Sequence, residues 1–326
     1  MFEPIARLVG RAALCAAAAV LPTATFAQDA VPEKPAQLSI LSGSTGGSWY
    51  AYSSGLIPIF QKEGITVTTM PGGGASNPLR ISAGEFLVGF GQTSANFDAS
   101  KGQGAFEGRD PITNLQNIAL MSTDHVHLIC LADSEVNSWK DLPKARFAAP
   151  AATTGSWGNF LAGLHAVGVS EDELNIVTRG NSGDNMTALR DREADCASYT
   201  SAWPVSTVTE VANSVDLKFI GLSDDEIAEV EASNPGFIAG TIPAGAYRGL
   251  DKDIKVYMAG SALMASESLP EGDAYWIVKT IYDNLDEVRK VHEGLKNLDG
   301  ETMVRAPVFK MHPGAAKFYR EVGLMD

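Results

Sequence analysis

The stretch that most constrains this fold covers residues 38–52 and reads LSILSGSTGGSWYAY. A short apolar run leads into a turn of serine, threonine and glycine, and a helix-compatible segment follows at 49–61. We interpret it as strand, glycine-rich turn and helix. Glycines let backbone N–H groups approach a ligand, and a helix start adds unpaired N–H groups and a positive dipole end. Such a turn binds a carboxylate or phosphate without a basic side chain. A tight turn with no ligand is the alternative.

The same device recurs along the first third of the chain. A β-branched segment at 64–70 leads into PGGGAS at 71–76, and Asn77-Pro78 is typical of an N-cap followed by proline at the first helical position. The third strand, at 86–90, ends in a polar turn at 92–96. Strands that alternate with helices predict parallel βαβ units, whose ligands lie outside the carboxyl ends of the strands. The repetition favours the ligand-binding interpretation.

A second copy of the motif follows. The strand at 146–149 enters a Thr/Ser/Gly turn at 150–157, which ends in a tryptophan at the start of a helix at 158–166. This predicts a second βαβ lobe. Further polar turns at 180–185 and 200–204 follow strands.

The connections between the lobes are also predicted from apolar runs. Residues 118–121 and 126–131 are expected to be two strands separated by Asp124-His125, and residues 256–265 are expected to cross back towards the first lobe. Amphipathic helices are expected at 227–232, 273–284, 286–295 and 314–321. The predicted segments are a signal peptide at 1–27, lobe I at 28–124, lobe II at 125–236, and a return to lobe I at 237–326.

The first 27 residues have the pattern of a secretory signal peptide. Arg7 and Arg11 precede an apolar run that is too short to span a bilayer, and Thr25-Phe26-Ala27 offers small residues at a cleavage site. We expect cleavage after Ala27, a periplasmic product and no stable membrane insertion of the mature chain. Residues 28–37 are expected to form a loose leader.

The net charge of −14 restricts the partners. Loss of the predicted signal peptide would remove two basic residues and one acidic residue, so the mature chain is slightly more acidic still. Such a chain is a poor binder of nucleic acid and of anionic lipid. A small anion remains compatible, because a cleft can be locally positive.

Two cysteines, Cys130 and Cys196, lie outside the signal peptide. An oxidising compartment permits a disulfide. The sequence does not place the two within bonding distance, and two buried free thiols are at least as compatible with their apolar surroundings.

Several catalytic patterns are missing from this sequence. The turn GSTGGSWY has no lysine after its glycines and lacks the glycine spacing of a dinucleotide site. Neither Ser44 nor Ser48 lies in a G-x-S-x-G elbow. His125 and His127 share a strand face but lack a third metal ligand. No catalytic residue, metal or cofactor is therefore expected; His125 is a candidate donor to a ligand at the cleft mouth.

Aromatic and basic residues near the turns have two readings each. Trp49, Tyr50, Trp157 and Trp203 either wall a ligand pocket or belong to the core. Two arginines, Arg80 and Arg179, either meet a carboxylate or are surface charges.

The chain resembles the TAXI-type solute receptors of TRAP transporters. The resemblance rests on SILSGSTGGSWYAYSSGL, MPGGGASNPLRISAGEFLVGFGQ, SWKDLPKARFAAP, READCASY with the following WP, IPAGAYRGLDKD and MHPGAAKFYREVG, in that order. It covers nearly the whole mature chain. It implies a type-II periplasmic-binding-protein fold, in which two α/β lobes joined by crossing strands close on a small organic anion.

The resemblance also implies a site and partners. The expected partners are a small organic anion and the small and large membrane subunits of a TRAP permease, fused or separate. The expected ligand-binding residues are Gly43, Ser44, Thr45, Gly46, Gly47, Ser48, Trp49, Tyr50, Asn77, Gln92, Ser94, His125, Thr153, Thr154, Gly155, Ser156, Trp157, Asn181, Thr200, Ser201 and Trp203.

Two departures from the family pattern bear on the ligand. Such receptors carry Gly-Ser before the second helix and an aspartate two residues after the glutamine, where this chain has Gly73-Gly74 and Ser94. A missing acidic group favours a ligand without an ammonium, such as a keto acid or dicarboxylic acid, although an acidic amino acid stays open. A sensory subunit of a membrane kinase and an enzyme on the same fold are the alternative functions.

Overall fold

The computed structural model describes residues 1–2, 31–43, 45, 48–152, 154–305 and 308–326. The chain divides into two compact units, residues 1–31 and 32–326, and every element below belongs to the second. The predicted signal peptide lies outside the described residues, apart from Met1 and Phe2.

Lobe I begins with three successive strand–helix pairs, as the alternation of apolar runs and polar turns predicts. Parallel pairing joins β1 to β2 on one side and to β3 on the other. The elements are β1 (Gln37–Leu41), α1 (Ser48–Lys62), β2 (Thr66–Met70), α2 (Ser76–Ser82), β3 (Val88–Gln92) and α3 (Thr93–Lys101). The carboxyl ends of β1 and β3 therefore open on the same edge of the sheet.

Two long strands carry the sheet from one lobe into the other. They are β4 (Leu115–Leu131) and β10 (Ile254–Ser266), which pair antiparallel; β10 also pairs with β3, and β4 with β7. The expectation of two strands separated by Asp124-His125 is wrong, because β4 runs through both residues. Paired neighbours on each side satisfy the backbone there, so the polar residues do not break the strand.

Lobe II repeats the parallel arrangement. There β5 pairs with β6 and β7 in parallel, β8 pairs with β4, and β9 pairs with β10. The elements are β5 (Arg146–Pro150), α4 (Gly155–Ala166), β6 (Asn175–Gly180), α5 (Ser182–Arg190), β7 (Cys196–Ser201), α6 (Ser206–Ser214), β8 (Leu217–Ile220), α7 (Asp224–Ser233) and β9 (Phe237–Ile242).

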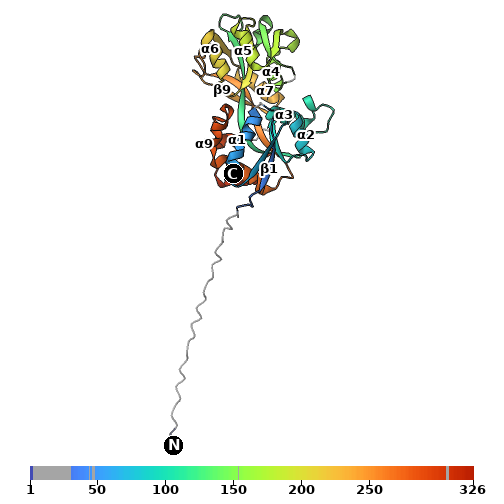
Figure 1. Cartoon of the computed structure of the whole chain (residues 1–326), viewed down its shortest axis with the longest axis vertical. Helices are drawn as coiled ribbons and strands as arrows, with labels where there is room; N and C mark the ends of the chain where they lie inside the picture. The colour runs from blue at the N-terminus through green and yellow to red at the C-terminus, as the bar shows by residue number, and fades with distance from the viewer. Residues whose placement is uncertain (3–30, 44, 46–47, 153, 306–307) are drawn as a thin grey trace. The chain divides into compact units, whose positions relative to one another are not determined.

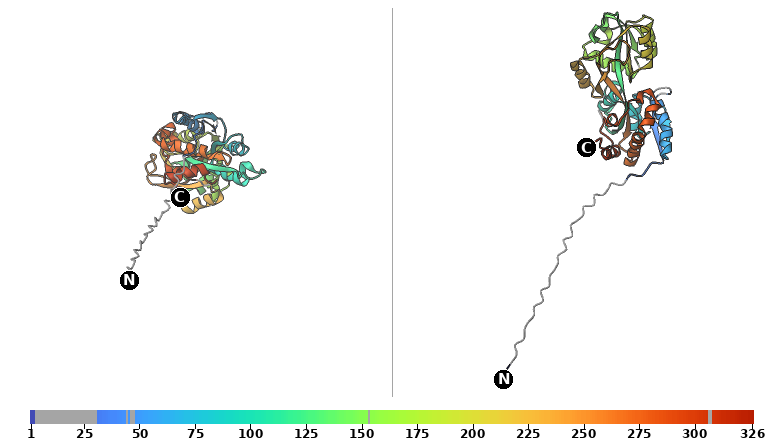
Figure 2. Two further views of the ribbon diagram at one scale, coloured as in Figure 1. Left: turned by 90° about the horizontal axis from the view of Figure 1, so that it is seen from below. Right: turned by 90° about the vertical axis from the view of Figure 1, so that its left-hand side faces the viewer.

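The C-terminal helices return to lobe I, as expected. These are α8 (Glu271–Asp283), α9 (Leu285–Val291), α10 (Gly300–Met303) and α11 (Pro313–Glu321). Figure 1 shows α4, α5 and α6 around one half of the sheet and α1, α2 and α9 around the other, and Figure 2 shows the blue first elements beside the red last ones. The type-II periplasmic-binding-protein fold with two lobes and crossing strands is confirmed.

Each lobe has its own apolar core. In lobe I the buried faces of β1 and α1 pack with α8 and α11, for example Leu56 and Phe60 with Ile277 and Phe318. In lobe II an aromatic stack forms the centre: Phe160 lies 4.7 Å from Phe147, 5.3 Å from Trp139 and 5.5 Å from Trp157, measured between ring centroids. Trp157 therefore belongs to the core, which is the second of its two readings.

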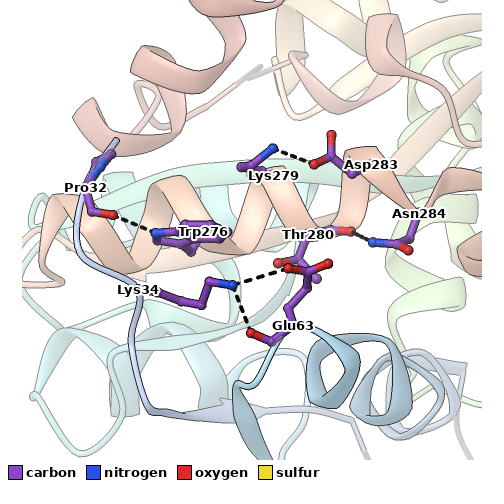
Figure 3. Close-up of polar contacts among 8 residues, drawn as sticks. All are labelled: Pro32, Lys34, Glu63, Trp276, Lys279, Thr280, Asp283 and Asn284. Atoms are coloured by element: carbon purple, nitrogen blue, oxygen red, sulfur yellow. Dashed lines mark hydrogen bonds and ion pairs between the residues drawn. The ribbon is translucent and has the colours of Figure 1, made fainter. Parts of the chain in front are cut away.

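The start of the second unit is fixed to lobe I, so the expectation of a loose leader is wrong for residues 32–37. The Trp276 indole N–H donates to the Pro32 carbonyl at 2.8 Å, and the Lys34 ammonium lies 4.1 Å from the Trp276 ring centroid (Figure 3). Lys34 also binds the Glu63 carbonyl at 2.9 Å and the Glu63 carboxylate at 3.3 Å. A cation over an indole face gains electrostatic attraction, which holds this segment against α8.

A disulfide joins Cys130 to Cys196, so the preference for free thiols is wrong. The two cysteines lie directly opposite each other on β4 and β7, with their Cα atoms 4.0 Å apart. Both are fully buried. Sequence spacing did not reveal the pairing because it depends on the antiparallel register of two strands 66 residues apart.

We predict that the double substitution Cys130→Ala/Cys196→Ala lowers the free energy of unfolding by roughly 2–4 kcal/mol, since the cross-link restricts the unfolded chain. Urea unfolding of the oxidised wild type and the variant measures the difference. Peptide mapping without reductant should recover the two cysteines in one linked species. Alkylation of both thiols in denatured, unreduced protein would contradict the pairing.

Candidate functional site

A pocket of about 300 Å³ lies where the turns of the two lobes meet. It is open to solvent, and glycine and other small residues make up much of its wall. The described residues that line it are Gly43, Ser48, Trp49, Gly73, Gly74, Gln92, Asp124, Gly155, Ser156 and Ser261. The structure thus brings together six of the sequence-predicted residues from both lobes, and adds four others.

Two helices from different lobes begin at this pocket. The first residues of α1 and α4 are Ser48 and Gly155, and both line it. Helix starts carry N–H groups without intrahelical partners and the positive end of the helix dipole. They provide the pocket with donors for an anion without a basic side chain.

The two lobes approach each other closely at the pocket. A Cβ atom on Gly155 would lie 2.8 Å from the Gln92 side-chain oxygen. Any larger residue at position 155 would therefore push aside the Gln92 amide, which is the flexible end of that side chain.

A chain of hydrogen bonds crosses the pocket floor. The Trp49 indole N–H donates to the Ser261 hydroxyl at 2.8 Å, and that hydroxyl donates to the Asp124 carboxylate at 3.3 Å. Ser261 and Asp124 come from the two crossing strands β10 and β4. In their antiparallel register Asp124 lies opposite Ala259, so Ser261 is a diagonal neighbour. Trp49 is held in turn by stacking on Phe90, 6.0 Å away.

Asp124 is an acidic group that is half-buried and lines the pocket. Burial raises its pKa from 3.8 to about 6, and the hydrogen bonds from Ser261 and the Ala202 backbone oppose that rise. Asp124 forms no ion pair within the described part of the chain.

Asn77 supports the pocket wall from behind. It is fully buried, and its amide donates to the carbonyls of Ser42 at 2.7 Å and Phe90 at 2.8 Å and accepts from the Gly73 N–H at 2.8 Å. It thus ties the ends of β1 and β3 to the second glycine-rich turn. The expectation of Asn77 as an N-cap is wrong, because Ala75 is the N-cap of α2 and the helix begins at Ser76, which makes Asn77 its second residue.

Ser94 lies at a contact between the lobes, outside the lining of the pocket. Its hydroxyl donates to the Asn159 side chain of α4 at 3.3 Å, and its carbonyl accepts from Asn234 at 3.1 Å. The neighbouring Thr93 hydroxyl donates to the Gly236 carbonyl at 2.5 Å. The start of α3 is therefore hydrogen-bonded to lobe II at several points.

His125 and Trp203 line a second pocket, of about 360 Å³, together with Arg305. Adjacent residues of a strand point to opposite faces, which separates His125 from Asp124. The His125 Nδ1 atom is buried without a partner, and burial lowers the pKa of His125 to about 3, helped by His127.

His127 is a core residue. One ring nitrogen faces the carbonyls of His125 and Tyr199, and the other accepts a hydrogen bond from Tyr247. The described residues contain no cluster of three metal-ligating side chains.

The remaining predicted residues lie elsewhere. Asn181 caps α5 by accepting from the Asp184 N–H, and the exposed Thr154 donates to the Ala151 carbonyl. Trp157 is buried under Arg179, whose guanidinium carbon lies 4.2 Å from the ring centroid. None of Thr45, Tyr50, Thr200 and Ser201 lines either pocket. Ser44, Gly46, Gly47 and Thr153 lie outside the described residues.

A family model matches residues 40–323 of this chain, which is almost the whole of the second unit. The chain belongs to the NMT1-like family. Within the described residues of this family member, no helix has the length and apolar character needed to cross a membrane.

The chain is also similar to several solved structures. The periplasmic sulfonate-binding protein SsuA from Methylobacillus flagellatus is 15% identical, with 90% of this chain and 89% of that chain covered and a TM-score of 0.49. The LysR-family regulator HinK from Pseudomonas aeruginosa is 13% identical, with 82% of this chain and 73% of that chain covered and a TM-score of 0.46. The L-cystine solute receptor of Neisseria gonorrhoeae is 14% identical, with 81% of this chain and 94% of that chain covered and a TM-score of 0.43.

We predict that Asp124→Asn removes a pH-dependent contribution to stability. Because folding raises the pKa of Asp124, the folded chain holds the proton more tightly, and the wild type loses stability as the pH rises from about 4 to above 6. Relative to the variant, the wild type loses at most about 3 kcal/mol of its free energy of unfolding over this pH range. Urea unfolding at pH 4, 5, 6 and 7.5 measures it. The titration of His125 and His127 is common to both proteins and cancels; a difference that stays constant with pH would contradict the prediction.

Proposed function

We propose that this protein is an extracytoplasmic solute-binding protein that captures a small organic anion in the pocket between its lobes and delivers it to a membrane permease. The observation that carries the proposal is the meeting of two helix starts, one from each lobe, in a pocket with no basic side chain among its described lining residues. This arrangement suits a carboxylate that is released again intact, because backbone donors hold an anion without reacting with it. We therefore propose a non-enzymatic role.

In the proposed mechanism the two lobes close around the ligand, with β4 and β10 as the connecting strands. A ligand that contacts donors of both lobes binds the closed state better than the open state, and shifts the population accordingly. The hydrogen bonds of Thr93 and Ser94 to lobe II support a closed arrangement that has its own contacts. We propose that lobe I comprises residues 32–124 and the return segment that begins with β10, and that lobe II comprises residues 125–236 together with β9, so that the first boundary lies inside β4.

An extracytoplasmic location is part of the proposal. Two observations support it: the signal-peptide pattern of residues 1–27, and a buried disulfide, which persists in oxidising compartments.

The transporter class we propose is a TRAP transporter of the TAXI type, on the strength of the ordered motifs in the sequence. The proposed partners are its small and large membrane subunits. Co-purification of the tagged protein with such a permease tests this assignment. A kinase in its place would favour the sensory alternative.

We predict that Ser156→Leu abolishes ligand binding and leaves the melting temperature of the empty protein near that of the wild type. Ser156 is half-buried in the first turn of α4 and lines the pocket, so a leucine fills the space of the ligand without disturbing a core. Native mass spectrometry of the purified protein identifies the ligand it carries, and calorimetry with that molecule measures the loss.

The matched control is Ser206→Leu, the same substitution at the exposed first residue of α6, outside both pockets. It should bind like the wild type. Unchanged affinity of Ser156→Leu would remove lobe II from the site.

A further inference from the structure

The pocket contains a single charged side chain, Asp124, among its described lining residues. Opposing it are the starts of α1 and α4, each equivalent to roughly half a positive charge. The two dipole ends together balance about one carboxylate. With Asp124 already ionised, a dicarboxylate would add two further negative charges that nothing in the described lining offsets. A ligand with a positive group beside its carboxylate restores the balance.

Asp124 also has unused acceptor capacity. An ionised carboxylate offers about four acceptor positions on its two oxygens. The protein supplies two donors, the Ser261 hydroxyl and the Ala202 backbone. Trp49 fixes the first of these, because its N–H occupies the Ser261 oxygen and directs the hydroxyl proton towards Asp124. The carboxylate is thus held in place, with acceptor positions left for a group in the pocket.

A partly buried carboxylate without an ion-pair partner destabilises the empty protein, and a cation bound beside it would offset that free energy. We infer that Asp124 binds the ammonium group of the ligand, and that the ligand is an α-amino acid whose carboxylate lies at the starts of α1 and α4. The inference rests on the proposed function and changes its ligand class from an organic anion to a zwitterion that carries a carboxylate.

Ser94 does not favour a ligand without an ammonium, because position 94 does not line the pocket. In the structure the Ser94 hydroxyl is used by Asn159, and the acidic group of the pocket comes from the crossing strand β4.

The first test compares each amino acid with its own 2-oxo acid. Thermal-shift screening of the twenty L-amino acids and their 2-oxo acid counterparts selects the pairs, and calorimetry at pH 7.5 measures them on the wild-type protein. We expect at least one amino acid to bind about tenfold or more tightly than its 2-oxo acid, because the buried charge pair is lost in the latter. Wild-type protein suffices, so the comparison does not depend on the folding of a variant.

Substitution then assigns the difference to Asp124. Asp124→Asn should weaken binding of the amino acid by about tenfold or more and so reduce the difference in affinity between the amino acid and its 2-oxo acid. The matched control is Asp273→Asn, which removes a carboxylate whose pKa burial also raises, in the first turn of α8 and outside the pocket. The control should keep wild-type affinity for both members of the pair.

The outcomes separate this inference from the proposed function. A 2-oxo acid that binds as tightly as its amino acid, or an Asp124→Asn variant that retains the advantage of the amino acid, overturns the role of Asp124 and leaves a carboxylate-binding receptor intact. Binding of neither class overturns this inference alone, and the proposed function is then tested by the ligand that native mass spectrometry identifies.

Proton linkage gives a second readout. At pH 6, close to the pKa of Asp124, a fraction of the empty sites carry its proton; an ammonium that ionises Asp124 releases this proton, whereas a dicarboxylate would draw more protons in. The titratable neighbours of Asp124 are Tyr52 on α1 and His125 on β4. Both are neutral at this pH, because burial raises the pKa of Tyr52 and lowers that of His125 to about 3. Calorimetry in two buffers of different ionisation enthalpy should show net release of protons on binding, absent in Asp124→Asn; uptake would overturn the inference.

Discussion

The antiparallel pairing of β4 with β10 is the interaction on which the rest of the structure depends. These two strands are the only ones in the described sheet long enough to contribute to the cores of both lobes. Their register brings Ser261 diagonally across from Asp124 at the junction, where Trp49 also reaches them. A slip of one residue would turn Asp124 to the opposite face of the sheet, so the register that joins the lobes also determines which polar groups the pocket receives.

Much of this architecture could be predicted from local patterns. The alternation of apolar runs with polar turns identified the strand–helix pairs, and the repeated Ser/Thr/Gly turn before a tryptophan identified two helix starts that do line one pocket, at Trp49 and Ser156. Such features are encoded within about fifteen residues of sequence, because hydrophobic periodicity and turn composition act locally. The pocket residues found this way lie at the ends of strands and at the starts of the helices that follow them.

What could not be predicted depends on contacts between distant segments. Asp124 interrupts an apolar run, and such an interruption predicts a break between strands. The strand nevertheless continues, because neighbours from β10 and β7 pair with it. The same holds for the disulfide, which needs the register of β4 and β7. Likewise, Asn77 has a typical capping sequence, yet its amide is used by three backbone groups from separate turns and strands.

The contrast between Asn77 and Asp124 explains how the pocket keeps its polarity available for a ligand. Every polar atom of Asn77 is used inside the protein, so it shapes the wall and offers nothing to the cavity. Asp124 is anchored by two donors but not neutralised, since no ion pair compensates its charge within the described residues. A partly buried charge left in that state costs the empty fold free energy. Such a cost makes sense in a protein whose function requires the partner of that charge to arrive from outside.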